Sequence, residues 1–115
     1  MRNRIITVPK DKKAEHSLDY DEARENQLIE WLLLDNEFDH LWEAGIFDLI
    51  NDTADSNIDD FEAESITETE GIKKVVEALK MRIEISNTEI RPLLFKVIRL
   101  FEEALSRNTS IHFFF

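Results

Sequence analysis

The feature that most limits how this chain can fold is a block of negative charge in its middle. From residue 25 to residue 72 there is no Lys or Arg, so the carboxylates of this block are not neutralised by neighbours in sequence. The block is densest over residues 48–70, which hold nine carboxylates. Side chains with such a field have to face water or a cationic partner.

Apolar residues inside this block predict that it is ordered. Ile58, Phe61 and Ile66 are interleaved with the acids of residues 58–66, and they are enough to hold the segment onto a core. A disordered acidic tract lacks such anchors. We therefore expect an ordered acidic surface, with partner-binding residues Asp48, Asp52, Asp55, Asp59, Asp60, Glu62 and Glu64.

Charge is unevenly distributed along the 115 residues. Residues 1–14 carry five Lys or Arg and one acid, residues 15–70 carry 19 acids and one Arg, and residues 71–115 carry eight basic and five acidic residues, for a net charge of −11. Such a field repels nucleic acid and accelerates encounters with basic proteins. The sequence therefore predicts a basic protein partner and no binding to DNA or RNA.

Length and composition favour one soluble domain, residues 1–115. With 43% hydrophobic residues and no Cys, the chain can bury a core without disulfides, which suits the cytoplasm. The apolar residues after Arg2 and Arg4 stop at Pro9, too early for a signal peptide, and no apolar run approaches the roughly 20 residues of a membrane helix. We expect a cytoplasmic protein without membrane contact, whose basic segment 1–14 is flexible or an edge strand.

Hydrophobic spacing predicts a mainly α fold, a compact bundle of four to five helices. Asp19 and Glu22 form a capping pattern at the start of the first expected helix. The prediction also allows the β-branched and aromatic ends of the chain, residues 4–8 and 111–115, to pair as short terminal strands. The expected helices run over about residues 20–34, 38–50 with a break at Gly45, 67–83 and 86–108, after a connector at 10–13.

Patterns for metal binding are incomplete. Glu37 and His40 form a Glu-x-x-His unit, which supplies two metal ligands in carboxylate-bridged bundles, but such a site needs a second unit. No acid lies three residues before His16 or His112. We expect a surface imidazole at His40 and no bound metal.

The sequence patterns for a calcium loop and for an enzyme active site are also incomplete. The segment beginning at Asp55 has oxygen ligands at the first, third and fifth positions, yet Asp60 stands where the loop requires glycine and Ile66 where it requires a bidentate glutamate. There is no Cys nucleophile, and the two glycines, Gly45 and Gly71, are too far apart for a phosphate-binding loop. The sequence predicts no catalytic residue, no cofactor and no enzyme activity.

Two stretches carry a resemblance to a known family. Residues 45–51, Gly-Ile-Phe-Asp-Leu-Ile-Asn, and 58–66, Ile-Asp-Asp-Phe-Glu-Ala-Glu-Ser-Ile, resemble the immunity proteins of bacterial polymorphic toxin and contact-dependent growth inhibition systems. The resemblance implies a cytoplasmic, non-enzymatic inhibitor that binds one cognate toxin domain, a basic nuclease, as a one-to-one heterodimer. A nuclease is cationic where it meets phosphate, so an acidic surface complements it.

The alternative function is an acidic decoy of phage or plasmid origin that mimics nucleic acid and blocks a host DNA-binding protein. Both functions place carboxylates where phosphates would otherwise lie. A large toxin gene upstream would favour the immunity protein, and neighbouring phage genes would favour the decoy. Without information on the neighbouring genes, the sequence favours the immunity protein, and the decoy is its alternative.

Overall fold

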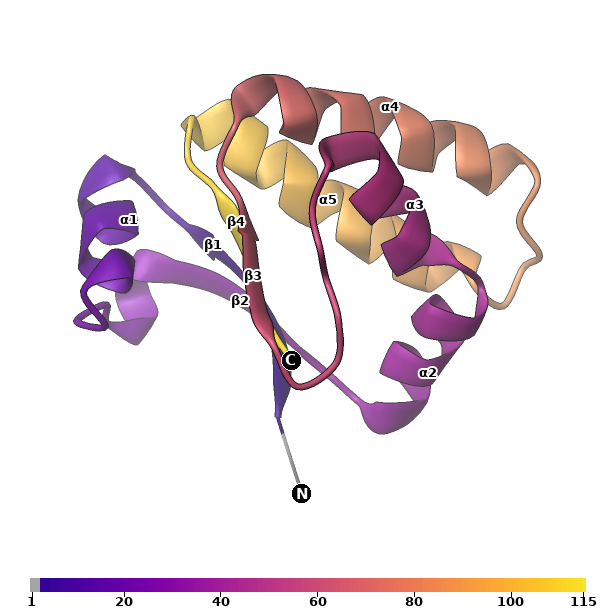
Figure 1. Ribbon diagram of the computed structural model, residues 1–115, viewed down its shortest axis with the longest axis horizontal. Coiled ribbons are helices and arrows are strands. Elements are labelled where there is room, and N and C mark those ends of the chain that lie inside the picture. The colour runs from indigo at the N-terminus through magenta and orange to yellow at the C-terminus, as the bar shows by residue number, and fades with distance from the viewer. Residues whose placement is uncertain (1–2) are drawn as a thin grey trace.

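The computed structural model describes residues 3–115 and shows an α+β fold, in which helices pack on a four-stranded antiparallel sheet (Figure 1). The strands, in the order β2-β1-β4-β3, are β1 (Arg4–Pro9), β2 (Leu28–Leu33), β3 (Ala63–Ile66) and β4 (Ile111–Phe114). The helices are α1 (Lys12–Asp19), α2 (Asp35–Glu43), α3 (Ile46–Ala54), α4 (Thr69–Glu84) and α5 (Arg91–Arg107), with a 3-10 turn at Glu25–Gln27. The predicted mainly α bundle is therefore wrong.

Part of the error comes from residues 20–34, where a helix was predicted. A helix would place Leu28, Trp31 and Leu32 on one face, but in β2 Trp31 packs against the core whereas Leu32 is 53% exposed on the other face. Successive side chains of a strand point to opposite faces, so two neighbours cannot share one. The chain leaves α1 through Asp21, whose left-handed φ of 57° ends the helix.

The two ends of the chain pair in the middle of the sheet. Ile6 lies opposite Phe113, and Thr7 lies opposite His112, in antiparallel register. The terminal strand pairing that the sequence allowed is thus present. However, β1 lies between β2 and β4, so it is not the predicted edge strand, and residues 1–2 of that segment lie outside the described residues.

Helix α1 occupies the connector expected near residue 12. It begins where Asp11 Oδ1 accepts a hydrogen bond from the Ala14 amide at 2.7 Å, an N-cap that the sequence reading overlooked. Figure 1 shows α1 on one side of the sheet and α2 to α5 on the other. Burial beneath α1 lowers the pKa of His112, against the opposing charge of Asp19 and Glu15 in α1.

The remaining helices agree with the prediction in part, since α4 begins at Thr69 and α5 at Arg91, two and five residues after the expected starts. Gly45, with a φ of 73°, separates α2 from α3 at the break that its conformational freedom suggested. Pro92 lies in the first turn of α5, where its missing N–H is tolerated. Asn108 ends α5 in the left-handed conformation, with a φ of 55°. These helices bury one apolar face against the sheet, centred on Ile6, Leu79, Leu94, Phe101, Ile111 and Phe113.

Replacing Phe101 by Ala should destabilise the protein by about 3–5 kcal/mol, because the side chain is fully buried against Phe113 and its removal leaves a cavity. Phe95→Ala on the same helix is the control, since Phe95 is 57% exposed and its loss should cost less than about 1 kcal/mol. Urea unfolding of both variants gives the comparison. Equal losses of stability would show that α5 does not bury the predicted face.

Candidate functional site

Helix α2 carries a stripe of carboxylates beside its buried face. Asp35, Asp39 and Glu43 are exposed and recur every four residues, so they follow one another in steps of about 6 Å along the helix axis. Phe38 and Leu41 turn toward the core. None of the three acids was predicted to bind a partner, although the spacing of Asp39 and Glu43 within an expected helix was the signal that points to them.

Helix α3 continues the acidic stripe with residues that the sequence did predict. Asp48 and Asp52 are exposed and lie one turn apart, and Asp55 follows at the C-cap with a left-handed φ of 53°. Ile46 and Ile50 are fully buried on the opposite side of the helix. The helix therefore presents its carboxylates to solvent while its apolar face fixes their positions.

The loop between α3 and β3 is ordered by one side chain. Asn51 donates Nδ2–H to the Ile58 carbonyl at 3.0 Å, and its Oδ1 accepts from the Ile58 amide at 2.7 Å and from Ser56 Oγ at 2.9 Å. Ile58 and Ile66 are buried, as predicted. Phe61 is 78% exposed, so its predicted role as an apolar anchor is wrong. The loop is held by the hydrogen bonds of Asn51 instead.

Asp60, a predicted binding residue, is bonded within the protein. Arg4 donates from Nε and Nη2 to its two carboxylate oxygens, each at 3.1 Å, and from Nη1 to Asp35 at 3.2 Å. The hydrogen bond to Asp60, followed by the negative charge of Asp60, Asp35 and Asp39, raises the pKa of Arg4 above its ordinary value, although burial opposes this. Arg4 thus ties the loop to β1 and α2.

Glu64 also has an internal role. Its two carboxylate oxygens accept from the amides of Asn57 at 2.7 Å and Ser65 at 2.9 Å, and these bonds close the loop onto β3. The other five predicted binding residues are exposed: Asp48, Asp52, Asp55, Asp59 and Glu62. Their exposure is compatible with partner binding, which stays a prediction.

The exposed carboxylates of α2, α3 and the loop belong to elements that contact one another, and we call them together the acidic surface. Arg4 connects the loop to α2, and Asn51 connects it to α3. Among residues 3–115, Arg4 is the cation that forms an ion pair with a member of this surface. The acidic surface consists of Asp35, Asp39, Glu43, Asp48, Asp52, Asp55, Asp59 and Glu62.

The charge density on α2 is close to that of one DNA strand. The helix has nine residues, of which Asp35, Glu37, Asp39 and Glu43 are acidic. At a rise of about 1.5 Å per residue, this is roughly one carboxylate per 3.4 Å of axis, which is also the axial spacing of phosphates along one strand. Three of the four, Asp35, Asp39 and Glu43, belong to the acidic surface, so this surface presents cations with about one carboxylate per 4.5 Å of the α2 axis.

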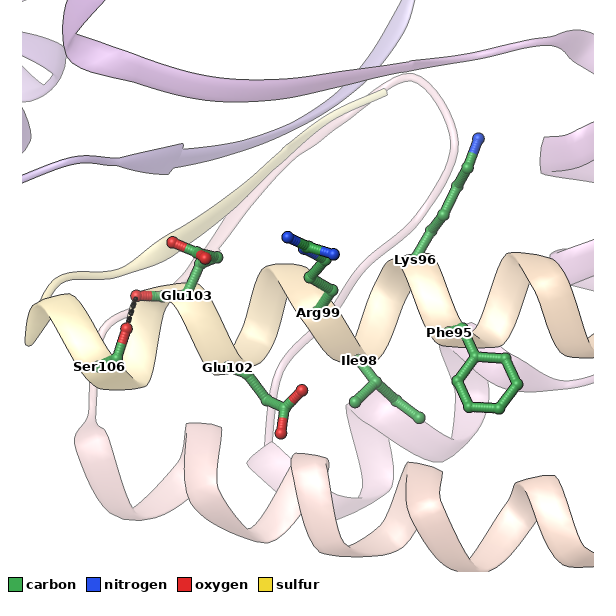
Figure 2. A pocket seen from close by; sticks show the side chains of 7 residues that line it. All are labelled: Phe95, Lys96, Ile98, Arg99, Glu102, Glu103 and Ser106. Atoms are coloured by element: carbon green, nitrogen blue, oxygen red, sulfur yellow. Dashed lines mark hydrogen bonds between the residues drawn. The ribbon is translucent and has the colours of Figure 1, made fainter.

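The exposed face of α5 differs in charge. Two of its carboxylates form ion pairs, Glu102 with Lys80 at 3.2 Å and Glu103 with Arg107 at 2.8 Å, so charges of both signs alternate there. A hollow of about 590 Å³ lies along this helix. Figure 2 shows the side chains that line it: Phe95, Lys96, Ile98, Arg99, Glu102, Glu103 and Ser106. This mixed surface has no field of one sign, and the acidic surface is the stronger candidate.

Residues 3–115 contain neither a cluster of metal ligands nor a membrane-spanning helix. No group of three or more His, Asp or Glu side chains within residues 3–115 is arranged to hold a metal ion. Glu37, from the Glu-x-x-His unit, accepts a hydrogen bond from the Leu34 amide at 2.8 Å and so caps α2. None of the described helices is long and apolar enough to cross a membrane.

The fold is similar to a solved structure over nearly its whole length. That structure is the Neisseria DNA mimic protein DMP12, with a TM-score of 0.71 and 21% sequence identity, and the match covers 99% of this chain and 100% of that chain. At this identity the likeness establishes the shared fold, and it agrees with an α+β arrangement in place of the predicted helical bundle. No protein-family model and no curated protein matches the sequence.

Asp60 should contribute more than its neighbour Asp59 to the free energy of unfolding. Asp60→Asn removes the negative charge and replaces one of the two oxygens that accept from Arg4 with an NH2 donor, and should destabilise the protein by about 1–3 kcal/mol. Asp59→Asn alters an exposed carboxylate and should change stability by less than about 0.5 kcal/mol. Urea midpoints of the two variants test this, and a larger loss for Asp59→Asn would contradict the assignment.

Proposed function

We propose that this chain is an acidic DNA mimic that binds a basic DNA-binding protein and occupies the surface with which that protein contacts DNA. The observation that carries the proposal is the acidic surface: exposed carboxylates, at regular spacing along α2 and α3, on an ordered scaffold. The shared fold with a protein described as a DNA mimic supports it. This function corresponds to the acidic decoy, the alternative that the sequence left open.

Electrostatics explains why such a surface competes with DNA. A DNA-binding protein holds phosphates with Lys and Arg side chains, and most of its sequence-independent affinity comes from these contacts. Carboxylates at similar spacing attract the same cations, so one such protein cannot hold DNA and the mimic at one site. The net charge of −11 also accelerates encounter with a basic partner.

Rigidity is the second requirement, and internal bonds supply it. A flexible acidic tail loses conformational freedom when it binds, which subtracts from its affinity. In this chain, Asn51 and Arg4 fix the loop, and the buried faces of α2 and α3 fix the two helical stripes. The carboxylates are therefore preorganised, and a partner can bind them without ordering the chain first.

The immunity-protein reading stays a prediction. It shares the requirement for a basic partner, and its ligand would be a nuclease toxin rather than a DNA-binding protein of the host. The likeness to a DNA mimic protein favours the host protein as the partner. A competition experiment separates the two readings by the identity of the protein that binds.

The chain should release duplex DNA from at least one basic DNA-binding protein of its own host cell. Each member of a purified panel is bound to labelled duplex DNA, and release is followed by fluorescence anisotropy as the chain is added. Competition should weaken as salt rises, because exposed charges carry the interaction. Release from no member of the panel, together with inhibition of a nuclease toxin, would replace this proposal with the immunity reading.

Paired charge reversals locate the competing surface. Asp48→Lys with Asp52→Lys on α3 should weaken competition by about tenfold or more, since it reverses two charges in the acidic surface. Glu77→Lys with Glu84→Lys on α4 makes the same change in net charge at exposed positions outside that surface, and should have a smaller effect. Equal losses would mean that net charge alone governs binding.

A further inference from the structure

Trp42 stands out among the residues beside the acidic surface. Its side chain is 42% exposed, although a large aromatic residue on an amphipathic helix usually packs into the core. On α2 it follows Asp39 by three residues, so the indole borders the carboxylate stripe on the side of Asp39. An exposed Trp next to carboxylates is unusual for a surface that binds through charge alone.

The indole is held by buried aromatic neighbours. Its ring stacks on Phe38, with centroids 5.7 Å apart and planes at 27°, and lies 6.1 Å from the ring of Phe47. Both Phe side chains are buried. Packing on one side and exposure on the other fix the ring before any partner arrives, and rigid aromatic side chains of this kind commonly anchor protein interfaces.

The same helix already binds a guanidinium in a similar setting. Arg4 lies 4.0 Å from the ring centroid of Phe38, and it pairs with Asp35 and Asp60. One helical turn later, Trp42 repeats the position of Phe38 and Asp39 repeats the position of Asp35, each displaced by four residues. The chain thus contains an internal example of an aromatic ring and carboxylates that together hold an Arg side chain.

We propose that Trp42 and Asp39 form a recognition site for an arginine side chain of the basic partner, an inference that rests on the proposed function and specifies its contact. The planar guanidinium stacks on the indole while its N–H groups bond to the Asp39 carboxylate. Arg suits this site better than Lys, because it is less strongly hydrated, stacks on aromatic rings and binds carboxylates with two N–H groups.

The site also adds something that charge mimicry lacks. Carboxylates reproduce the phosphate field and attract Lys and Arg alike, whereas an aromatic face discriminates between the two cations. The contact therefore selects, among basic DNA-binding proteins, those that present Arg where the mimic binds. It distinguishes one partner from another without adding negative charge.

The test measures the preference for Arg over Lys with octa-arginine and octa-lysine peptides, which carry the same charge. Affinities of both labelled peptides are compared for the wild-type chain and for Trp42→Leu. The ratio of the two affinities should fall by about two- to fivefold in Trp42→Leu, while the dependence of each affinity on salt should stay the same. Trp42→Phe keeps an aromatic face and should retain most of the preference.

A second readout comes from fluorescence. The sequence contains two Trp residues, so in Trp31→Phe the emission reports on Trp42 alone. Octa-arginine should change that emission more than octa-lysine at equal occupancy, and Trp31→Phe should leave the affinity ratio at its wild-type value. Circular dichroism and the urea midpoint of each variant show whether it is folded.

The outcomes separate the two proposals. If both peptides bind and Trp42→Leu keeps the wild-type preference for Arg, the arginine site is overturned and the acidic surface is unaffected. If neither peptide binds at low salt, the acidic surface does not attract cations as the proposed function requires, and that proposal falls as well. Loss of the preference in both Trp42→Leu and Trp42→Phe, with both variants folded, also contradicts stacking on an aromatic face.

Discussion

The pairing of β1 with β4 is the interaction on which the acidic surface depends. It brings both ends of the chain to the centre of the sheet. The pairing of Arg4, the first residue of β1, with Leu33 of β2 then places Arg4 beside the start of α2. From there Arg4 bonds to Asp60 and Asp35. A cation from the start of the chain thereby joins two acidic segments that would otherwise repel each other.

That arrangement explains how so many carboxylates coexist on an ordered surface. Repulsion between like charges favours separation of the segments that carry them, and here it is opposed by the buried faces of α2 and α3 and by the bonds of Asn51 and Arg4. The exposed acids are left to face solvent as an ordered field of negative charge. An ordered and exposed surface of this kind is what the proposed binding function requires.

Much of the helical layer could be predicted, because α4 and α5 have apolar residues at regular helical spacing and Gly45, Pro92 and Asn108 mark boundaries by their backbone preferences. The sheet could not be predicted so well. In β2 the apolar residues are nearly continuous, so their spacing fits a helix and a strand alike, and only pairing with β1 decides between them.

The candidate site was predicted in part for similar reasons. Exposure of Asp48, Asp52 and Asp55 follows from charge and helical position. The engagement of Asp60 depends on Arg4, a partner 56 residues away in sequence, which no local pattern reveals. The exposure of Trp42 likewise depends on how α2 and α3 meet, and amphipathic spacing alone places this residue in the core.

The most direct test is to map the interface by NMR, with the isotope-labelled chain bound to a DNA-binding protein from which it displaces DNA. The account predicts that the largest amide shifts occur within residues 35–62, and that the indole N–H of Trp42 shifts with them. Shifts confined to the exposed face of α5 or to α1, with residues 35–62 unaffected, would contradict the claim that these carboxylates stand in for phosphates.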